Sequence, residues 1–391
     1  MKDVHLVIIG GGPAGLSTAL HLQAVAPRIA DRTVVLEAKP YPREKICAGA
    51  VGARAFRVLE RIGVAVECPM VKLDAVALRL GSRTIVTRDP DLGVVVRRVE
   101  FDHALAKIAI ERGIEVRDAT PVTAIDLLGD HALVYTDAEV YRTRAIVGAD
   151  GVSGITRRAT GFARGELRAQ VIELDTEGVA SDEPRDTAVF DFTARDLHGY
   201  AWDFPTLVGG KPLVCRGAYV IHSLEHDSPK MRIDRYLRDR GLHLHKYRLK
   251  QFAERGFEPG AAIARPRVLL VGEAAGIDIA TGEGIAQAIE YGQVAGPYLA
   301  RAFAHDDFSF ASWTGHVERR HVGWQLRVRH ACYRMFYGEG RDSIERILPR
   351  LTSLMKVGVQ DFAGKKLSKL AIARGAAQFV GAYLGDKLRA E

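Results

Sequence analysis

The stretch HLVIIGGGPAGLSTALHLQAV near the N-terminus constrains the fold more than any other part of the chain. Its apolar run, Val4–Ile9, has the length of a buried parallel strand, and Ala14–Val25 has the apolar spacing of a helix packed against that strand. Between them, Gly10, Gly12 and Gly15 match a GxGxxG spacing, whose glycines permit a tight turn, close approach to a pyrophosphate, and close packing of helix on strand. The stretch therefore predicts a phosphate-binding loop at a helix N-terminus.

A second strand supports this prediction. Thr33–Leu36 has the apolar content of a strand and ends in Glu37, which lies 22 residues after Gly15. A carboxylate at this distance from a glycine loop is placed to bind the hydroxyls of an adenosine ribose. Glu37 favours a free 2′-hydroxyl, so we expect a dinucleotide without a phosphate at that position. This unit alone does not distinguish NAD from FAD.

A second glycine-rich junction, far along the chain, favours FAD. AIVGADGVSGITRR at 145–158 contains a strand that runs into Asp150-Gly151, and RVLLVGEAAGIDIATGEGIAQAIEYG at 267–292 contains a strand, a small-residue loop and a helix that begins near Gly284. A simple dehydrogenase does not need a second glycine-rich junction. A flavin does, because its ribityl chain and isoalloxazine ring extend well beyond the adenosine half of the cofactor. The new helix N-terminus can support negative charge on a reduced flavin ring. The small residues that let backbone approach the cofactor are Ala274, Ala275, Gly276, Gly282 and Gly284.

The chain as a whole predicts an α/β protein. It has a Rossmann-like FAD-binding domain, an inserted, mainly antiparallel β-sheet substrate domain of α+β type, and a helical C-terminal region. In the first domain we expect a helix at Val99–Arg112, a strand at Ile114–Arg117, and a hairpin of Leu133–Thr136 and Val140–Val147. The predicted boundaries are 1–70, 93–160 and 265–305 for the FAD-binding domain, 71–92 and 161–264 for the substrate domain, and 306–391 for the C-terminal region, interrupted at Gly338–Gly340 and Gly358.

Composition excludes several classes of function. The four cysteines, Cys47, Cys68, Cys215 and Cys332, have no metal-binding or disulfide spacing, which predicts no metal site and suits a reducing cytoplasm. The formal net charge is +7, and residues 317–391 alone carry 15 Lys and Arg against 7 Asp and Glu. Basic and aromatic residues do not interleave as they do in nucleic-acid-binding proteins, so we expect no nucleic-acid partner.

The basic C-terminal region has two interpretations. Leu, Ile and Phe stand among Lys and Arg at helical spacing, so an amphipathic helix could seat the protein on anionic lipid. The alternative is a helix that covers the core and keeps its cationic face in water. No segment has the apolar length of a signal peptide or a membrane span. We therefore expect a cytoplasmic protein, peripheral at the inner face of the membrane if the first interpretation holds.

Six short motifs give the chain a resemblance to a known family. GGGPAG, RRVEFDHALA, GADG and GEAAG…TGEGI resemble the p-hydroxybenzoate hydroxylase-like FAD superfamily over most of residues 1–300. Two narrower motifs, KICAGA and YAWDFP, are similar to those of the geranylgeranyl reductase family, whose signature is YxWxFP. The resemblance implies FAD as cofactor and a hydrophobic small-molecule substrate.

The motif YAWDFP has two interpretations. Side chains alternate along a strand, so Tyr200, Trp202 and Phe204 share one face, with Ala201 and Asp203 opposite. By itself the pattern favours a sheet face packed on core helices. With the resemblance, we expect these three aromatic side chains to bind substrate as the wall of a cavity against the flavin.

The resemblance also implies roles for individual residues. Arg98 and the loop 45–48 would contact the flavin side, Val122 would lie by the adenine, and Asp150 would close over the pyrophosphate. Glu273, where the family usually carries Asp, would face the ribityl chain. The predicted cofactor-binding residues are Gly10, Gly12, Pro13, Ala14, Gly15, Glu37, Ala38, Ile46, Cys47, Ala48, Arg98, Val122, Asp150, Gly151, Gly272, Glu273, Gly282, Gly284 and Ile285.

Cys47 is the candidate for a catalytic role. It follows the ribose-binding strand and would run beside the isoalloxazine, where a thiol could tune the ring, donate a proton or provide room. The alternative is a small core residue, because free cysteine is among the most often buried types. Arg43 and Lys45 in the same loop are interpreted as solvated or phosphate-facing.

These features predict an FAD-dependent oxidoreductase, with reduction of a C=C double bond in a prenyl-type compound as the first hypothesis. Ala48, Ile279 and the lone Gly217 of CRGAYV depart from the reductase pattern, so an NAD(P)H-dependent monooxygenase of an aromatic or polyketide-like molecule stays open. YAWDFP only partly resembles the WxWxIP signature of flavin halogenases, so a halogenase is less favoured. The third hypothesis is a flavoprotein that is not an enzyme. The chain has no second GxGxxG unit, so electrons would come from transiently docked NAD(P)H or from a small carrier protein.

Overall fold

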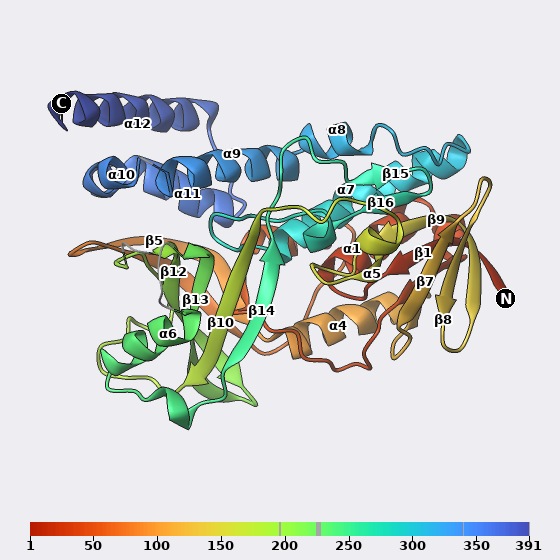
Figure 1. Ribbon diagram of the computed structural model, residues 1–391, viewed down its shortest axis with the longest axis horizontal. Coiled ribbons are helices and arrows are strands. Elements are labelled where there is room, and N and C mark those ends of the chain that lie inside the picture. Colours follow the sequence, from red (N-terminus) through yellow and green to blue (C-terminus); the bar gives the residue numbers. More distant parts are fainter. Residues whose placement is uncertain (195–196, 224–227, 339, 391) are drawn as a thin grey trace.

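Two sheets and a row of C-terminal helices make up the computed structural model (Figure 1). The structure describes residues 1–391 apart from 195–196, 224–227, 339 and 391, and within this part each sheet has eight strands. The first sheet contains the strand before the glycine loop, and the second contains the YAWDFP motif. This mixed α/β architecture, with a helical C-terminal region, confirms the predicted fold class.

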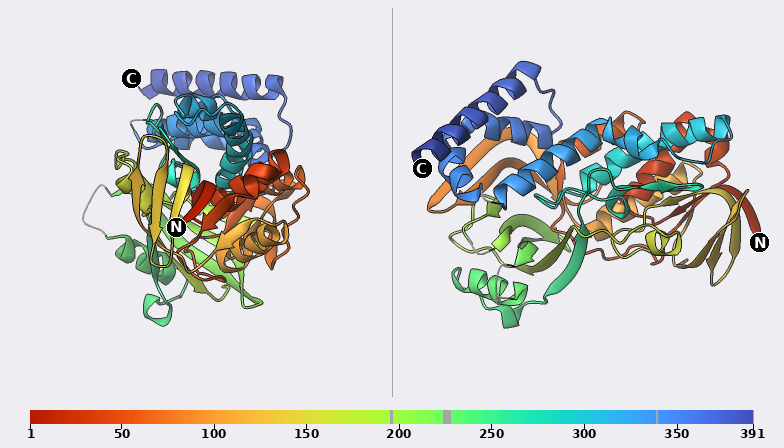
Figure 2. Two further views of the ribbon diagram at one scale, coloured as in Figure 1. Left: turned by 90° about the vertical axis from the view of Figure 1, so that its right-hand side faces the viewer. Right: turned by 45° about the horizontal axis from the view of Figure 1, so that its top comes forward.

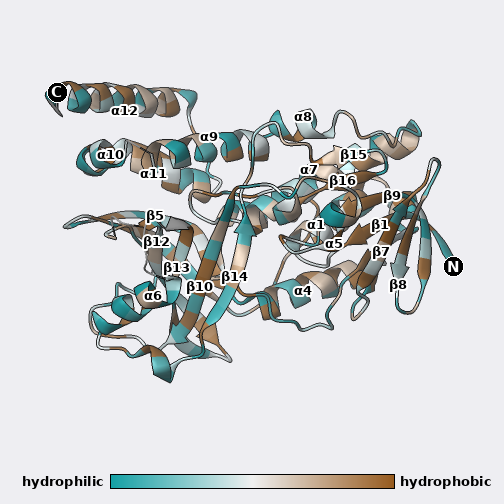
Figure 3. Cartoon of the chain, viewed as in Figure 1, coloured by the Kyte–Doolittle hydropathy of each residue, from teal (hydrophilic) through white to brown (hydrophobic). Residues whose placement is uncertain are grey.

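The first sheet is parallel around its central strand, β1. Its order is β15-β16-β9-β1-β2-β6, and β8 and β7 extend it antiparallel from β9. Val7 of β1 is in register with Val34 of β2 and Ile146 of β9, and all three are fully buried, as in a parallel sheet covered on both faces (Figure 3). The bounds are β1 Lys2–Ile9, β2 Thr33–Leu36, β6 Glu115–Arg117, β7 Val122–Leu127, β8 Ala132–Thr136, β9 Val140–Gly148, β15 Ala264–Arg265 and β16 Val268–Leu270.

Helices α1 and α7 bring the two glycine-rich junctions together. α1 (Pro13–Val25) and α7 (Ile285–Ala304) pack along each other, and α4 (Arg98–Glu111) also contacts α1. Close approach of α1 to β1 requires a glycine, because a Cβ atom on Gly15 would lie 2.0 Å from the carbonyl oxygen of Gly10. The remaining helices of this part are α2 Pro27–Ala30, α3 Ala53–Glu60, α5 Ile155–Ala159 and the 3-10 helix Gly272–Ala274.

The second sheet is antiparallel except where β4 and β11 pair in parallel. Its order is β14-β10-β13-β12-β11-β4-β5-β3, and α6 (Pro229–Arg238) packs against β10 and β13. β3 and the end of β5 belong to this sheet although they lie outside the segments expected for the substrate domain, whose boundaries stay a prediction. The bounds are β3 Ala50–Gly52, β4 Met70–Leu80, β5 Arg83–Val96, β10 Arg168–Thr176, β11 Thr187–Asp191, β12 Leu197–Val208, β13 Lys211–Ser223 and β14 Lys250–Arg255.

α10, α11 and α12 form a layer over the second sheet, with α12 outermost, whereas α8 lies over α7 (Figure 2). The interruption predicted at Gly338–Gly340 falls between α9 and α10, although residue 339 lies outside the described residues. The interruption predicted at Gly358 is wrong, because Gly358 lies inside α11, where a glycine costs only about 1 kcal/mol. Within the described part, no helix combines the length and apolar character needed to cross a bilayer. The bounds are α8 Trp313–Glu318, α9 His321–Phe336, α10 Arg341–Ile347, α11 Thr352–Phe362 and α12 Lys369–Ala390.

Candidate active site

A cavity of about 1290 Å³ lies between the two sheets and the C-terminal helices. Its lining comes from the loops after β1, β2 and β9, from one face of the second sheet, from the N-terminus of α7, and from α9, α11 and α12. A pocket for one drug-sized ligand has roughly 300–1,000 Å³. The cavity therefore has room for a large cofactor together with a substrate.

The glycine loop forms part of this lining and offers an anion site. A Cβ atom on Gly12 would meet only the guanidinium groups of Arg43 and Arg98, each at 3.6 Å. These two cations and the N-terminus of α1 direct positive charge and hydrogen-bond donors toward one point. Guanidinium groups bind phosphate oxygens in pairs of hydrogen bonds, so this donor set fits a pyrophosphate. Arg43 is buried and faces Gly12 rather than solvent.

A buried carboxylate holds both guanidinium groups in place. Asp102 of α4 accepts hydrogen bonds from Arg98 at 2.6 and 2.7 Å and forms an ion pair with Arg43 at 3.1 Å. Burial disfavours the charged form of Arg98, but Asp102 outweighs burial and raises the pKa of this guanidinium above its ordinary value. Asp102 therefore fixes both guanidinium groups beside Gly12, where their remaining N–H groups can donate to a ligand.

Glu37 stands beside the glycine loop at the end of β2. Its carboxylate accepts hydrogen bonds from the backbone N–H groups of Gly11 at 2.9 Å and Lys39 at 3.1 Å, and its Oε1 lies 3.1 Å from Nε of Arg43. The hydroxyl of Tyr41 donates to the carbonyl of Gly11 and ties the same loop from the other side. The acid is therefore fixed where β2 and the glycine loop meet, which is the position that ribose binding needs.

Asp150 and Glu273 are carboxylates of the lining that each have an oxygen without a hydrogen-bond partner among the described residues. Oδ2 of Asp150 accepts hydrogen bonds from the N–H and hydroxyl of Thr156, each at 2.8 Å, but Oδ1 of Asp150 and Oε1 of Glu273 accept none. Burial raises the pKa of Asp150, and Thr156 opposes this shift. A buried polar atom left unpaired costs about 1–3 kcal/mol. Both oxygens therefore fit the hydroxyl groups of a bound cofactor.

Most of the residues that the sequence predicted for the site are brought together in the lining. Gly15, Gly272, Ala274, Ala275 and Gly276 are outside it. A Cβ atom on Gly272 would lie 2.5 Å from Cβ of Ala14, so this glycine serves helix packing. The predicted residues in the lining are Gly10, Gly12, Pro13, Ala14, Glu37, Ala38, Ile46, Cys47, Ala48, Arg98, Val122, Asp150, Gly151, Tyr200, Trp202, Phe204, Glu273, Gly282, Gly284 and Ile285.

The aromatic side chains of β12 form one wall of the cavity. Tyr200, Trp202 and Phe204 are buried, and all three line it. Tyr219 of β13 stacks on Tyr200 with ring centroids 5.3 Å apart, and Phe190 of β11 lies at the same distance from Tyr200. The strand period therefore places the motif as expected, with its aromatic face toward the cavity.

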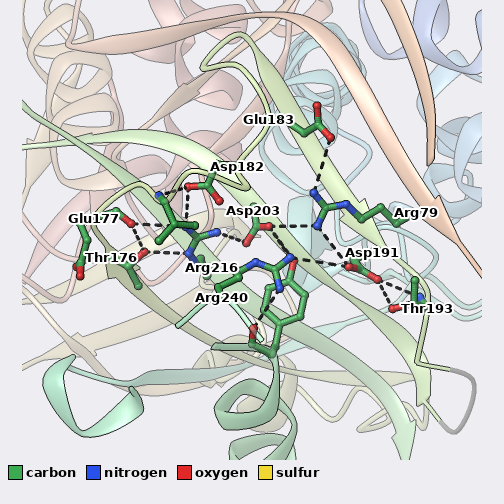
Figure 4. Close-up of polar contacts among 12 residues, drawn as sticks. Arg79, Thr176, Glu177, Asp182, Glu183, Asp191, Thr193, Asp203, Arg216 and Arg240 are labelled. Carbon is green, nitrogen blue, oxygen red and sulfur yellow. Dashed lines mark hydrogen bonds and ion pairs between the residues drawn. The ribbon is translucent and has the colours of Figure 1, made fainter. Parts of the chain in front are cut away.

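Charged residues anchor the opposite face of β12 (Figure 4). Arg216 lies 2.7 Å from Oδ1 of Asp203, while Arg240 at 3.0 Å and Arg79 at 3.8 Å face Oδ2. The hydroxyl of Tyr236 donates to the same oxygen at 2.8 Å. Removing one partner of a buried ion pair costs about 3–5 kcal/mol. This network therefore fixes the strand that carries the aromatic wall.

Cys47 lines the cavity with a neutral thiol. Burial raises the pKa of this thiol, and the charge of Arg98 opposes the shift only in part. A reactive cysteine needs its thiolate form, which an electropositive and solvated setting favours. The setting of Cys47 instead favours the S–H form, and its catalytic role stays a prediction.

The loop before α7 is held from two sides. The hydroxyl of Tyr200 donates to the carbonyl of Thr281, which ties the loop to the aromatic wall. Arg329 of α9 forms ion pairs with Asp278 at 2.6 Å and Glu283 at 2.7 Å. The C-terminal helices therefore hold a loop that lies along the cavity, and no local pattern in the sequence indicates this contact.

Sequence reasoning missed a large part of the lining. The C-terminal helices contribute apolar side chains, and β11, β13 and β14 contribute aromatic and acidic ones. Apolar spacing shows that a helix has a buried face, but the partner of that face depends on contacts between distant segments. The missed residues that matter most are Phe190, Tyr219, Phe252, Glu254, Trp324, Val328, Tyr333, Phe336, Leu354, Met355, Phe362, Ile372, Ala376 and Phe379.

Comparison with known proteins agrees with a flavin site. Residues 3–196 match a protein family described as FAD binding domain. Residues 3–196 therefore form a domain of this FAD-binding family. Membership supports FAD as the cofactor and an FAD-dependent oxidoreductase as the general activity, and the donor set around the glycine loop fits that cofactor.

Alignments with distant relatives cover most of the chain. It is 23% identical to digeranylgeranylglycerophospholipid reductase 3 of Methanosphaera stadtmanae over 95% of this chain and 96% of that protein. It is 26% identical to the menaquinone reductase of Mycolicibacterium smegmatis over 74% of this chain and 75% of that protein. A geranylgeranyl bacteriochlorophyll reductase-like structure from Thermoplasma acidophilum, 19% identical and covering 96% of each chain, has a TM-score of 0.67 and shows the shared fold.

Proposed function

We propose that this protein is an FAD-dependent reductase that saturates a C=C double bond of a prenyl-type compound. The observation that carries the proposal is one cavity with two chemically different parts. One part has the glycine loop and the charged residues around it, and the other has the aromatic wall and the apolar faces of the C-terminal helices. A dinucleotide needs the first part and a hydrocarbon chain needs the second.

In this proposal, the residues near the glycine loop hold the cofactor. Arg43 and Arg98 bind the pyrophosphate, Glu37 binds the ribose, and the unpaired oxygens of Asp150 and Glu273 accept hydrogen bonds from the remaining hydroxyls. FAD, when bound, supplies two-electron chemistry to a substrate that lies against it. The electron donor is proposed to be NAD(P)H, which docks transiently, or a small carrier protein.

The apolar part orients the substrate and excludes water. Trp202 and Phe204 of β12 face a lining that continues through Phe336 of α9, Phe362 of α11 and Phe379 of α12. Burial of apolar surface is worth roughly 25 cal/mol per Å², and a hydrocarbon chain has no polar groups that the wall would leave unpaired. Two relatives whose names describe reductases, one of them for a digeranylgeranyl lipid, support the same substrate class.

The experiment that tests this proposal is anaerobic mixing of the reduced holoenzyme with a geranylgeranyl-bearing lipid. We expect the absorbance of oxidised flavin to return with the unsaturated lipid and not with its fully saturated counterpart, because only the former accepts hydride. Equal behaviour with both lipids would contradict the proposal. Reoxidation that needs oxygen and hydroxylates an aromatic compound would favour a monooxygenase instead.

A further inference from the structure

A buried acid on the second sheet has no role in the site described so far. Glu254 of β14 lines the cavity and is 9% exposed. Its Oε2 has no hydrogen-bond partner in the described part of the chain. An unpaired buried carboxyl oxygen costs about 1–3 kcal/mol, so an oxygen of this kind that also lines a cavity is a candidate to meet a ligand or to serve a reaction.

Glu254 lies against the loop before α7. A Cβ atom on Gly282 would be 3.2 Å from Oε2 of Glu254 and 2.8 Å from Cε2 of Tyr219. Gly282 itself lines the cavity with φ +67°, and its lack of a side chain lets its backbone pack closely against Tyr219 beside the acid. The hydroxyl of Tyr219 is a second buried polar group without a partner among the described residues. Two unpaired groups, one acidic and one phenolic, thus meet at the loop whose small residues we expect to approach the flavin.

The surroundings of Glu254 favour its neutral form. Burial is the largest cause, and the carboxylates of Glu273, Asp278 and Glu173 add to it, so the pKa of Glu254 lies well above its ordinary value. Lys45 is the cation that opposes this shift. A carboxyl group that keeps its proton at neutral pH can donate it, as general acids in enzymes do.

We propose that Glu254 is the proton donor of the alkene reduction, a role that rests on the proposed function. The O–H bond of its carboxyl group breaks, and the proton forms a C–H bond at the alkene carbon that does not receive the hydride. The hydride would come from reduced FAD held in the same cavity, and NAD(P)H or the carrier protein would restore the two electrons that this transfer removes. Glu254 is left as a carboxylate and regains a proton from water before the next turnover.

Two neighbours are weaker candidates for the same role. Burial raises the pKa of Tyr219 well above 10, so its hydroxyl is the poorer acid and fits a hydrogen bond to substrate or cofactor. The thiol of Cys47 also holds its proton more tightly than usual because burial raises its pKa. Glu254 combines an acidic group, an unpaired oxygen and a place in the lining.

The first test compares variants in a single turnover. The reduced holoenzyme is mixed anaerobically with geranylgeranyl lipid in D₂O, with E254Q, Y219F and C47A as variants and E60Q, an exposed acid of α3, as the matched control. We expect E254Q to slow alkene reduction by about 10²–10⁴-fold and to lose stereospecific deuterium uptake at one carbon. Reoxidation by ferricyanide, which takes electrons only, should match that of the wild type and E60Q.

Either of two results would overturn the assignment. One is that E254Q keeps the wild-type rate and stereospecific deuterium uptake. The other is that Y219F or C47A loses more rate than E254Q, which would move the donor to that residue. Because each rate is referred to ferricyanide reoxidation in the same variant, loss of flavin or of the fold is recognised separately.

The second test needs no substrate. The infrared carbonyl band of neutral carboxylic acids is measured at neutral pH. Glu173 also contributes to this band, so the spectrum of E254Q is subtracted from that of the wild type to isolate the contribution of Glu254. We expect a positive band, and its absence would overturn the neutral-acid assignment. If the band is present but the wild type reduces no prenyl compound, the proposed function fails and the donor role fails with it. If the wild type reduces the alkene and E254Q does so equally well, the donor role fails alone.

Discussion

Gly12 shows most clearly that the glycines of one motif can serve different purposes, either ligand binding or packing of the fold. A Cβ atom there would find open space on the cavity side, bounded only by two guanidinium groups, whereas a Cβ atom on Gly15 would collide with the backbone of Gly10. The same motif therefore contains one glycine that the ligand needs and another that the fold needs.

We expect Gly12→Val to fold but to purify without flavin. The valine side chain would occupy the space near Arg43 and Arg98 that the pyrophosphate needs, whereas its Cβ atom would meet no backbone atom of another segment within 4 Å. The ratio of flavin to protein absorbance and the thermal midpoint of the apoprotein measure the two effects. Gly15→Val is the matched control and should lose stability itself. Full flavin occupancy in Gly12→Val would show that the loop has been assigned wrongly.

Glu173 shows how burial of one acid links stability to pH. It is 1% exposed on β10, and burial raises its pKa to about 7, although Lys250 and Arg97 oppose this shift. Between its unfolded pKa near 4.5 and its folded pKa, the native state binds more protons than the unfolded state. The stability contributed by this group is therefore complete below pH 4.5 and is lost as the pH rises toward 7.

We expect Glu173→Gln to remove this dependence. The free energy of unfolding of the variant should rise relative to the wild type by about 3 kcal/mol between pH 4.5 and 7, because a tenfold change in a proton-binding constant corresponds to about 1.4 kcal/mol. Urea unfolding at a series of pH values measures the difference. An exposed control, Glu60→Gln, should show no trend, and a flat difference for Glu173→Gln would contradict the argument.

At the scale of elements, α12 has an apolar face that no other described segment covers. Along the same helix stand the cations Lys369, Arg374, Lys387 and Arg389, and the other face of α12 contributes to the cavity. The exposed apolar side chains are Leu370 at 78%, Val380 at 53%, Leu384 at 57% and Leu388 at 75%. Apolar side chains flanked by cations are typical of helices that lie on anionic bilayers.

We propose that α12 seats the protein on an anionic bilayer. The wild type should float with vesicles of phosphatidylcholine and phosphatidylglycerol but not with phosphatidylcholine alone, and salt should weaken the binding. The double variant Leu384→Glu with Leu388→Glu should stay with the unbound protein, whereas Ile110→Glu, at an exposed apolar site of α4, should float. Equal flotation of both variants, or binding without anionic lipid, would contradict the proposal.

Local patterns predicted the elements of the first sheet well. Thr33–Leu36 is β2 as expected, and the expected Val99–Arg112 is α4 to within one residue, because the apolar residues of both segments follow a regular spacing in the sequence. The pattern missed β7, whose exposed residues alternate weakly and whose place depends on pairing with β8. Gly358 was expected to interrupt a helix, but α11 continues through it. The prediction failed because the sequence does not show the packing of a helix against its neighbours, which can outweigh the low helix propensity of one glycine.

At the scale of the molecule, the cavity is the feature that the sequence could not show. Its charged part follows from motifs within single strand–loop–helix units, which is why residues such as Glu37 and Asp150 are predictable from the sequence. Its apolar part is assembled from β12, β13, β14 and the C-terminal helices, which meet only through the fold. Glu254 was missed for the same reason, since one acid on a short strand has no pattern of its own.

The measurement that tests the central claim most directly is the mass of the product formed under ¹⁸O₂. The holoenzyme, NAD(P)H or a reduced carrier, and a geranylgeranyl lipid are incubated together, and the lipid is analysed by mass spectrometry. A reductase that binds its substrate in this cavity adds two hydrogens for each double bond and no ¹⁸O. A product that carries ¹⁸O would contradict the account and identify a monooxygenase.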